Sequence, residues 1–140
     1  MTAAIQTRLS LPLLAVALGA CSAGFAQEPA PRAGWTPPIG PNPVFDTAPA
    51  AAPGHRLIVT DLNLGPDAVG DPHSHPWEEF LYVIAGEALV GLPGAEPQVV
   101  SAGETFTIPP RVIHTPKAGP EGVRAIVIRV HLTDDPVTLP

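Results

Sequence analysis

The sequence predicts an all-β fold, with short antiparallel strands arranged as a sandwich or barrel. From His55 onward, short runs rich in valine and isoleucine alternate with glycine and proline turns, a pattern typical of small all-β domains. The same region shows no amphipathic helical period and no internal repeat. About 85 to 110 residues remain after the N-terminal segments, which is enough for one domain with a modest hydrophobic core.

Residues 1–26 have the pattern of an export signal. Arg8 precedes a twelve-residue apolar run, residues 9–20, which is too short to cross a bilayer as a helix. Two processing routes remain open. Residues 24–26 form a small-x-small cleavage site that would leave Gln27 as the new N-terminus, whereas residues 18–21 resemble a lipoprotein box in which Cys21 is lipidated. Both routes predict a secreted, periplasmic or extracellular protein, attached to a membrane only if Cys21 is lipidated.

The next segment, residues 27–54, is predicted to be a proline-rich linker or arm. Eight prolines lie between positions 28 and 53. Because proline fixes φ and removes a backbone donor, neither a helix nor a central strand fits there. Trp35, Val44 and Phe45 are expected to dock partly on the domain. Cys21 is the only cysteine, so the mature domain is predicted to contain no intramolecular disulfide.

The folded domain is predicted to span residues 55–132, followed by a C-terminal tail, residues 133–140. Strands are expected over residues 56–64, 79–85, 88–92, 98–100, 105–108, 112–115 and 123–132, with Gly86 as a turn between the second and third. Side-chain alternation predicts the following residues on the inner face: Val83, Ala88, Val90, Ile108, Ile126 and Ile128. An error of one residue in the register of any strand would invert its two faces.

Two histidines and a glutamate form the candidate site. His73 and His75 are one residue apart and Glu79 follows four residues later, so in an extended segment all three can point the same way. Imidazole together with carboxylate suits a divalent transition metal such as Fe, Mn, Ni, Cu or Zn. His114, in a second stretch, offers a fourth ligand. The two histidines alone would be read as surface residues of a turn, and Glu79 with His114 favours a metal site instead.

These two stretches resemble the motifs of the cupin family. The first motif is H-x-H, three or four residues, Glu, six residues and Gly, which His73, His75, Glu79 and Gly86 match in full. The second is Gly, five residues, Pro-x-Gly, two residues, His, three residues and Asn. Gly103, Pro109 and His114 are in register with it, whereas Arg111 and Ala118 replace the expected Gly and Asn. Asp67 stands where a further Gly usually precedes the first His. The resemblance covers about residues 55–131.

The resemblance implies a double-stranded β-helix, or jelly-roll barrel, of the cupin type, with a metal held by His73, His75, Glu79 and His114. The resemblance to small cupins of the quercetin dioxygenase type implies a dioxygenase, in which Glu79 is a metal ligand or a catalytic base. A metal-dependent isomerase or lyase, and a non-enzymatic module that binds or senses a small ligand, remain open. Because cupins often pair through their sheets and both faces of residues 79–84 are apolar, a homodimer is expected.

The net charge and the remaining polar residues limit the possible partners of the protein. Loss of residues 1–26 removes one basic residue and no acid, so the net charge of −6 becomes −7. An acidic chain without a basic patch argues against nucleic acid as a partner and leaves a small-molecule substrate or ligand. His55 and His131 are predicted to be ordinary surface residues, and Glu78 a solvated charge at the rim. Arg111 and Lys117 are candidates for holding an anionic substrate, although solvated loop positions fit them better.

Overall fold

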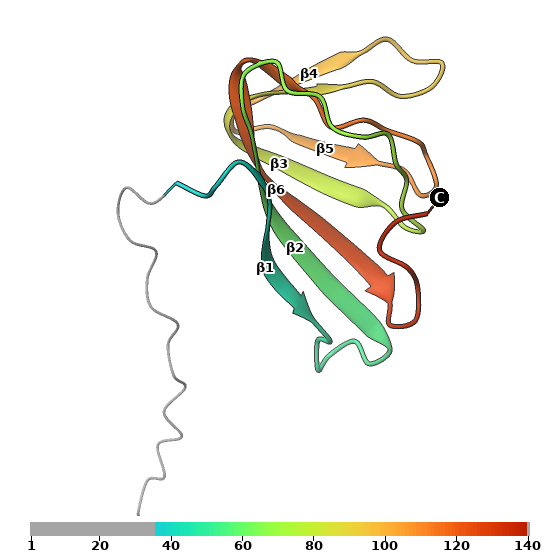
Figure 1. Cartoon of the computed structure of the whole chain (residues 1–140). Coiled ribbons are helices and arrows are strands. Elements are labelled where there is room, and N and C mark those ends of the chain that lie inside the picture. Colours follow the sequence, from blue (N-terminus) through green and yellow to red (C-terminus); the bar gives the residue numbers. More distant parts are fainter. Residues whose placement is uncertain (1–35, 140) are drawn as a thin grey trace, which may run out of the picture. The chain divides into compact units, whose positions relative to one another are not determined.

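The computed structural model describes residues 36–139, and every regular element in that range is a β-strand (Figure 1). The strands are β1 (Gly40–Thr47), β2 (His55–Leu64), β3 (Glu79–Val90), β4 (Gln98–Ser101), β5 (Thr105–Ile108) and β6 (Ala118–Leu132). The all-β prediction is therefore confirmed. Within residues 36–139 no helix is long and apolar enough to cross a membrane. The export signal, both processing routes at Cys21 and Gln27, and Trp35 lie outside the described residues and stay predictions.

The strands pair antiparallel throughout, in the order β1-β2-β6-β3-β4. Strand β3 changes its partner along its length, because its first residues pair with β5 and its last residues with β4 (Figure 1). The long strand β6 lies between β2 and β3 and joins the two halves of the molecule. This order places the loops that follow β2 and β5 beside the start of β3.

Gly86 lies within strand β3, so the predicted turn at this position is wrong. It adopts a φ of 69°, and the pairing of β3 with β6 shifts register on both sides of it. A β-carbon on Gly86 would lie 2.1 Å from the carbonyl oxygen of Gly122, a distance that no real side chain tolerates. Gly86 therefore forms a β-bulge, which is a common role of glycine within a strand, and the chain continues through it as one long strand.

Strand β6 begins at Ala118, five residues before the predicted start, and its register inverts the predicted inner face. Ala125 is 0% exposed and Val127 is 5% exposed, whereas Ile126 and Ile128 are only half-buried on the opposite face. The other four predicted inner residues are buried, namely Val83, Ala88, Val90 and Ile108. The alternation along β6 is apolar on both faces, so hydrophobicity alone could not choose between them.

Strand β1 lies inside the stretch predicted to be a linker, which corrects that prediction for residues 40–47. It is the edge strand beside β2, and an edge is the place in a sheet where proline is tolerated. Pro41 and Pro43 both sit in this strand, and the register shifts between Pro43 and Phe45. Val44 and Phe45 are 47% and 55% exposed. The arm therefore docks mainly through its backbone.

The tail after β6 also packs back onto the domain. The amide of Leu139 donates to the carbonyl of Ser74 at 2.8 Å, and the indole Nε1 of Trp77 donates to Asp135 at 2.6 Å. Ser74 and Trp77 belong to the loop that carries the two predicted histidine ligands. The tail is thus attached to the candidate site.

Candidate metal centre

Two loops and the first residue of β3 build the candidate metal centre. His73 and His75 lie in the loop between β2 and β3, and His114 lies in the loop between β5 and β6. The amides and carbonyls of His73 and His114 exchange two hydrogen bonds of 2.9 Å. This single antiparallel bridge replaces the strand predicted over residues 112–115. It holds two imidazoles side by side at one end of the sheet.

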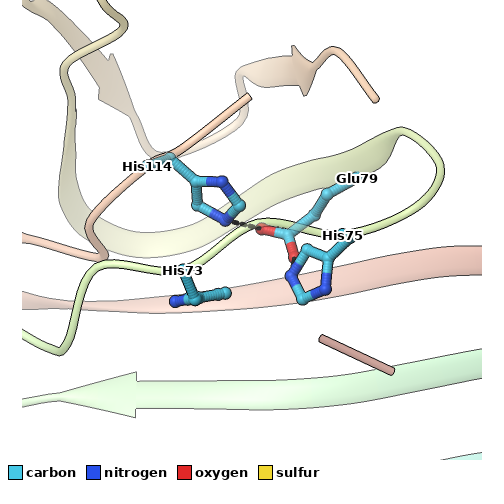
Figure 2. Close-up of side chains that lie close together, drawn as sticks. All are labelled: His73, His75, Glu79 and His114. Atoms are coloured by element: carbon cyan, nitrogen blue, oxygen red, sulfur yellow. Dashed lines mark ion pairs between the residues drawn. The ribbon is translucent and has the colours of Figure 1, made fainter. Parts of the chain in front are cut away.

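The four predicted ligands converge (Figure 2). The centroids of the His73 and His114 rings are 4.5 Å apart, and those of His73 and His75 are 4.9 Å apart. Nε2 of His75 lies 3.0 Å from Oε2 of Glu79, and Nε2 of His114 lies 3.7 Å from Oε1. His75, Glu79 and His114 are buried, and His73 is half-buried. The structure therefore brings together the three residues that share one parity and the fourth candidate from the second stretch, His114.

All three imidazoles are fixed in the same way, through Nδ1 and a backbone carbonyl. Nδ1 of His73 contacts the carbonyl of Asp71 at 2.9 Å, and Nδ1 of His114 contacts the carbonyl of Val112 at 3.0 Å. Nδ1 of His75 contacts the carbonyl of Val137, in the C-terminal tail. A ligating histidine characteristically donates its other ring N–H to such a group. With Nδ1 engaged in this way, Nε2 is the ring atom available to a metal; in His75 and His114 it lies 3.0 Å and 3.7 Å from the carboxylate of Glu79.

Charge and burial shift the pKa values of Glu79 and His114 towards the protonation states that a metal requires. Burial alone would raise the pKa of Glu79, but the hydrogen bond from His75 and the charges of His114, His75 and Arg129 outweigh it and lower that pKa below its ordinary value. Burial is also the main cause that lowers the pKa of His114. Metal ligands must be ionised carboxylates and neutral imidazoles, so both shifts favour ligation.

The residues present fit a divalent transition metal. One ligand atom from each of the four residues lies within 4.8 Å of the others, and atoms about 2.1 Å from one shared ion can be at most about 4.2 Å apart. Small side-chain adjustments close that difference. Nε2 of His114 is buried without a hydrogen-bond partner among the described residues, which is a costly state unless another group completes it. The cluster is consistent with a transition-metal site.

Two cavities meet at this cluster. The larger has a volume of about 360 Å³, and His73, Glu79 and Arg129 contribute polar groups to its lining. The smaller, about 50 Å³, is mostly apolar and lies against Glu79 and His114. Ligand pockets usually have volumes of about 300 to 1,000 Å³. The larger cavity is therefore the one that can admit a small molecule beside the four ligands.

The comparisons with known proteins agree with this fold. Residues 61–129 match the family model described as "Cupin domain", and all four predicted ligands lie inside the match. The chain therefore carries a cupin domain and belongs to the cupin family. A variant of oxalate decarboxylase from Bacillus subtilis has the same fold, with a TM-score of 0.52 at 20% identity over 61% of this chain and 27% of that chain. At this identity the likeness concerns the fold alone.

Curated relatives in sequence carry the name 3-hydroxyanthranilate 3,4-dioxygenase. The protein of that name from Jannaschia sp. (strain CCS1) is 33% identical over 95 residues, which is 66% of this chain and 48% of the relative. The protein from Ruegeria pomeroyi is 34% identical over the same shares of the two chains. This chain thus spans about half the length of the curated relatives it matches.

The site also contains residues that sequence reasoning missed. Arg129 lies on the inner face of β6 beside Glu79, and the register error for β6 had placed it outside. His131, predicted to be a surface residue, is 0% exposed and its ring lies 6.1 Å from that of His75. Both share the parity of Ala125 and Val127, so the correct register would have found them. Arg111 and Lys117 are exposed, as predicted.

Two strained positions coincide with departures from the family motif. Asp67 and Arg111 stand where the cupin pattern has glycine, and they are the non-glycine residues with positive φ among residues 36–139, at 54° and 62°. The left-handed conformation is ordinarily reserved for glycine. The backbone therefore keeps the turn that glycine would favour. At Arg111 this turn places its amide 2.8 Å from the carbonyl of His75.

Proposed function

We propose that this cupin is a metal-dependent dioxygenase that acts on a small oxygenated or aromatic compound. The observation that carries the proposal is the cluster of His73, His75, Glu79 and His114 at the wall of a cavity of about 360 Å³. The named dioxygenases similar to this chain support the reaction class. A divalent transition metal bound there would act as a Lewis acid and orient both reactants.

The residues of the chain would prepare the site for that chemistry. Three imidazoles fixed through Nδ1 and one ionised carboxylate would hold the metal. Leu62, Leu64 and Val127 line the larger cavity beside Glu79 and would exclude water from an apolar part of the substrate. His73 is the half-buried member of the set and faces that cavity, so a substrate would approach from its side.

Metal identification followed by oxygen uptake tests this function. The protein is purified from its native host, its metal is identified by mass spectrometry, and oxygen consumption is measured with catechols, flavonols and 3-hydroxyanthranilate. We expect one tightly bound transition metal per chain and consumption with at least one of these compounds. His114→Ala should abolish both, while His55→Ala, outside the cluster, should change neither.

Two results would replace the proposal. Bound metal with turnover of an oxygenated compound in the absence of oxygen would indicate an isomerase or lyase that uses the same ligands. Metal or ligand binding without turnover of any compound would indicate a binding or sensing module. If the purified wild-type protein contains no metal, and its metal content is the same as that of His114→Ala, the metal site itself is rejected.

A further inference from the structure

The cavity beside the four predicted ligands is lined by one largely buried cation, Arg129. Its side chain is 11% exposed, on the inner face of β6 directly opposite Glu79. Its Nε lies 3.9 Å from Oε2 of Glu79 and has no hydrogen-bond partner among residues 36–139. A buried guanidinium with an unused donor is costly unless a further group completes it.

The atoms that now lie next to Arg129 are the same atoms that a metal would bind. One terminal nitrogen lies 3.3 Å from Nε2 and 3.4 Å from Nδ1 of His75, and the carboxylate of Glu79 is the nearest anion. A metal ion would take the lone pair of His75 and the charge of Glu79. Because Nδ1 of His75 donates to Val137, it offers Arg129 no acceptor either. The hydroxyl of Thr60, 3.5 Å from the other terminal nitrogen, would remain as a hydrogen-bond partner of Arg129 among the described residues, and its other donors would be available to the cavity that Arg129 lines.

The net charge of the metal-loaded site also favours an additional anionic group beside Arg129. Three neutral imidazoles, one carboxylate, one guanidinium and a divalent ion carry a net charge of about +2 in a partly buried space, which is expensive to leave uncompensated. Asp71 is an exposed acid at the rim of the same cavity, where solvent screens it. An anionic group inside the cavity would supply the missing charge.

We propose that Arg129 binds a carboxylate of the substrate, so that the site selects small carboxylates over neutral compounds of the same shape. The planar guanidinium matches the two oxygens of a carboxylate. This inference rests on the proposed function for the presence of the metal, and it adds the substrate class and the residue that reads it. Arg129 is a binding and positioning residue, since it takes no part in bond making.

Calorimetric titration with benzoate and its neutral counterpart benzamide tests the inference. Metal-loaded wild-type protein should bind benzoate about ten- to a hundredfold more tightly than benzamide, the size expected for a charge-assisted pair of hydrogen bonds. Arg129→Met should bind the two compounds alike, and Arg129→Lys should recover only part of the preference because it lacks the planar fork. Lys117→Met, which removes an exposed cation beside the smaller cavity, should keep the wild-type preference.

The metal content of Arg129→Met separates ligand binding from a structural role. Removal of a cation beside the metal should leave metal affinity unchanged or raise it. A loss of metal, or an undiminished benzoate preference in Arg129→Met, would overturn the inference. If Arg129→Met does not fold, Arg129→Gln, which keeps length and a polar end, takes its place in the same comparison.

Failure of the inference is distinguishable from failure of the proposed function. A wild-type protein that carries metal but binds benzoate and benzamide equally refutes the role of Arg129 and leaves the metal site intact. A metal-loaded wild-type protein without oxygen uptake that still shows a preference dependent on Arg129 supports the carboxylate subsite. In that case the dioxygenase proposal is the one that fails.

Discussion

Glu79 and Arg129 are cross-strand partners at the point where β3 and β6 reach the site, with Nε of Arg129 3.9 Å from Oε2 of Glu79. The carboxylate also lies 3.0 Å from Nε2 of His75. Burial alone would raise the pKa of Glu79, but the hydrogen bond from His75 and the charges of His114, His75 and Arg129 together lower it. A general base works best when its pKa lies near the operating pH, so this environment favours Glu79 as a ligand.

Glu79→Gln separates the two roles of this residue, because it keeps the shape and removes the charge. If Glu79 is a ligand, Glu79→Gln should bind the metal more weakly, and turnover per bound metal should change little. As a base, its loss should reduce turnover per bound metal by about a hundredfold or more. The measurement is metal content and rate at saturating metal. Glu78→Gln, its half-buried neighbour, is the control and should change neither quantity.

The C-terminal tail should be required for full metal affinity. Val137 accepts the hydrogen bond that orients His75, and loss of such a partner typically lowers metal affinity by about ten- to a hundredfold. Deletion of residues 134–140 should therefore weaken metal binding by that factor, measured by competition with a chelator. Asp135→Ala removes the bond to Trp77 but leaves the carbonyl of Val137 in place, so affinity should stay nearly unchanged. Equal affinities in the truncated and full-length chains would show that His75 is oriented without the tail.

The sequence predicted the cluster of four candidate ligands better than it predicted the residues around them. His73, His75, Glu79 and His114 could be found because their spacing is a local property of two short motifs. Arg129 depends on the register of β6, where residues on both faces are apolar. The contact between Val137 and His75 joins residues 62 positions apart through a backbone carbonyl, which no side-chain pattern records. The edge strand β1 was missed because its prolines are typical of a linker. Proline excludes a central strand but is tolerated in an edge strand.

Arg111→Gly should stabilise the protein. A left-handed conformation costs a residue with a β-carbon about 1 to 2 kcal/mol, and glycine removes this cost. Glycine also destabilises the folded state by about 0.5 to 1 kcal/mol, because its unfolded chain has greater conformational freedom. The free energy of unfolding in urea should therefore rise by up to about 1.5 kcal/mol. Asp67→Gly should gain less, because aspartate tolerates this conformation better. A loss of stability in Arg111→Gly would mean that the arginine side chain makes a compensating contact.

The outer face of the large sheet should be covered by a second copy of the chain. Phe80 and Tyr82 on β3, Val130 on β6 and Phe45 on β1 are 39%, 46%, 40% and 55% exposed, and contiguous apolar patches of this kind on monomers are rarely large. We propose a homodimer through this face, observable by sedimentation. Tyr82→Glu should give monomers, while Val99→Glu, an exposed position on β4, should not. A wild-type protein that is monomeric at micromolar concentration would refute the dimer.

His131 should make the metal-free protein less stable as the pH falls. Burial, followed by the charges of Arg129 and His75, lowers the pKa of His131 below its ordinary value of 6.5, and the carbonyl of Pro136 and the charge of Asp135 oppose this only in part. The unfolded chain then binds a proton more readily than the folded one. The stability from neutral His131 is therefore fully present above pH 6.5 and is lost as the pH falls below that value towards the folded-state pKa.

Urea unfolding of chelated protein between pH 7.5 and 5.5 measures this loss. His131→Leu replaces the buried ring with an apolar group of similar volume, so stability at pH 7.5 should change little and the decline towards pH 5.5 should become shallower. Part of the decline should persist, because burial also lowers the pKa of His114. His55→Gln, on the partly exposed start of β2, should retain the wild-type slope. An identical slope in His131→Leu and the wild type would show that His131 does not titrate in this range.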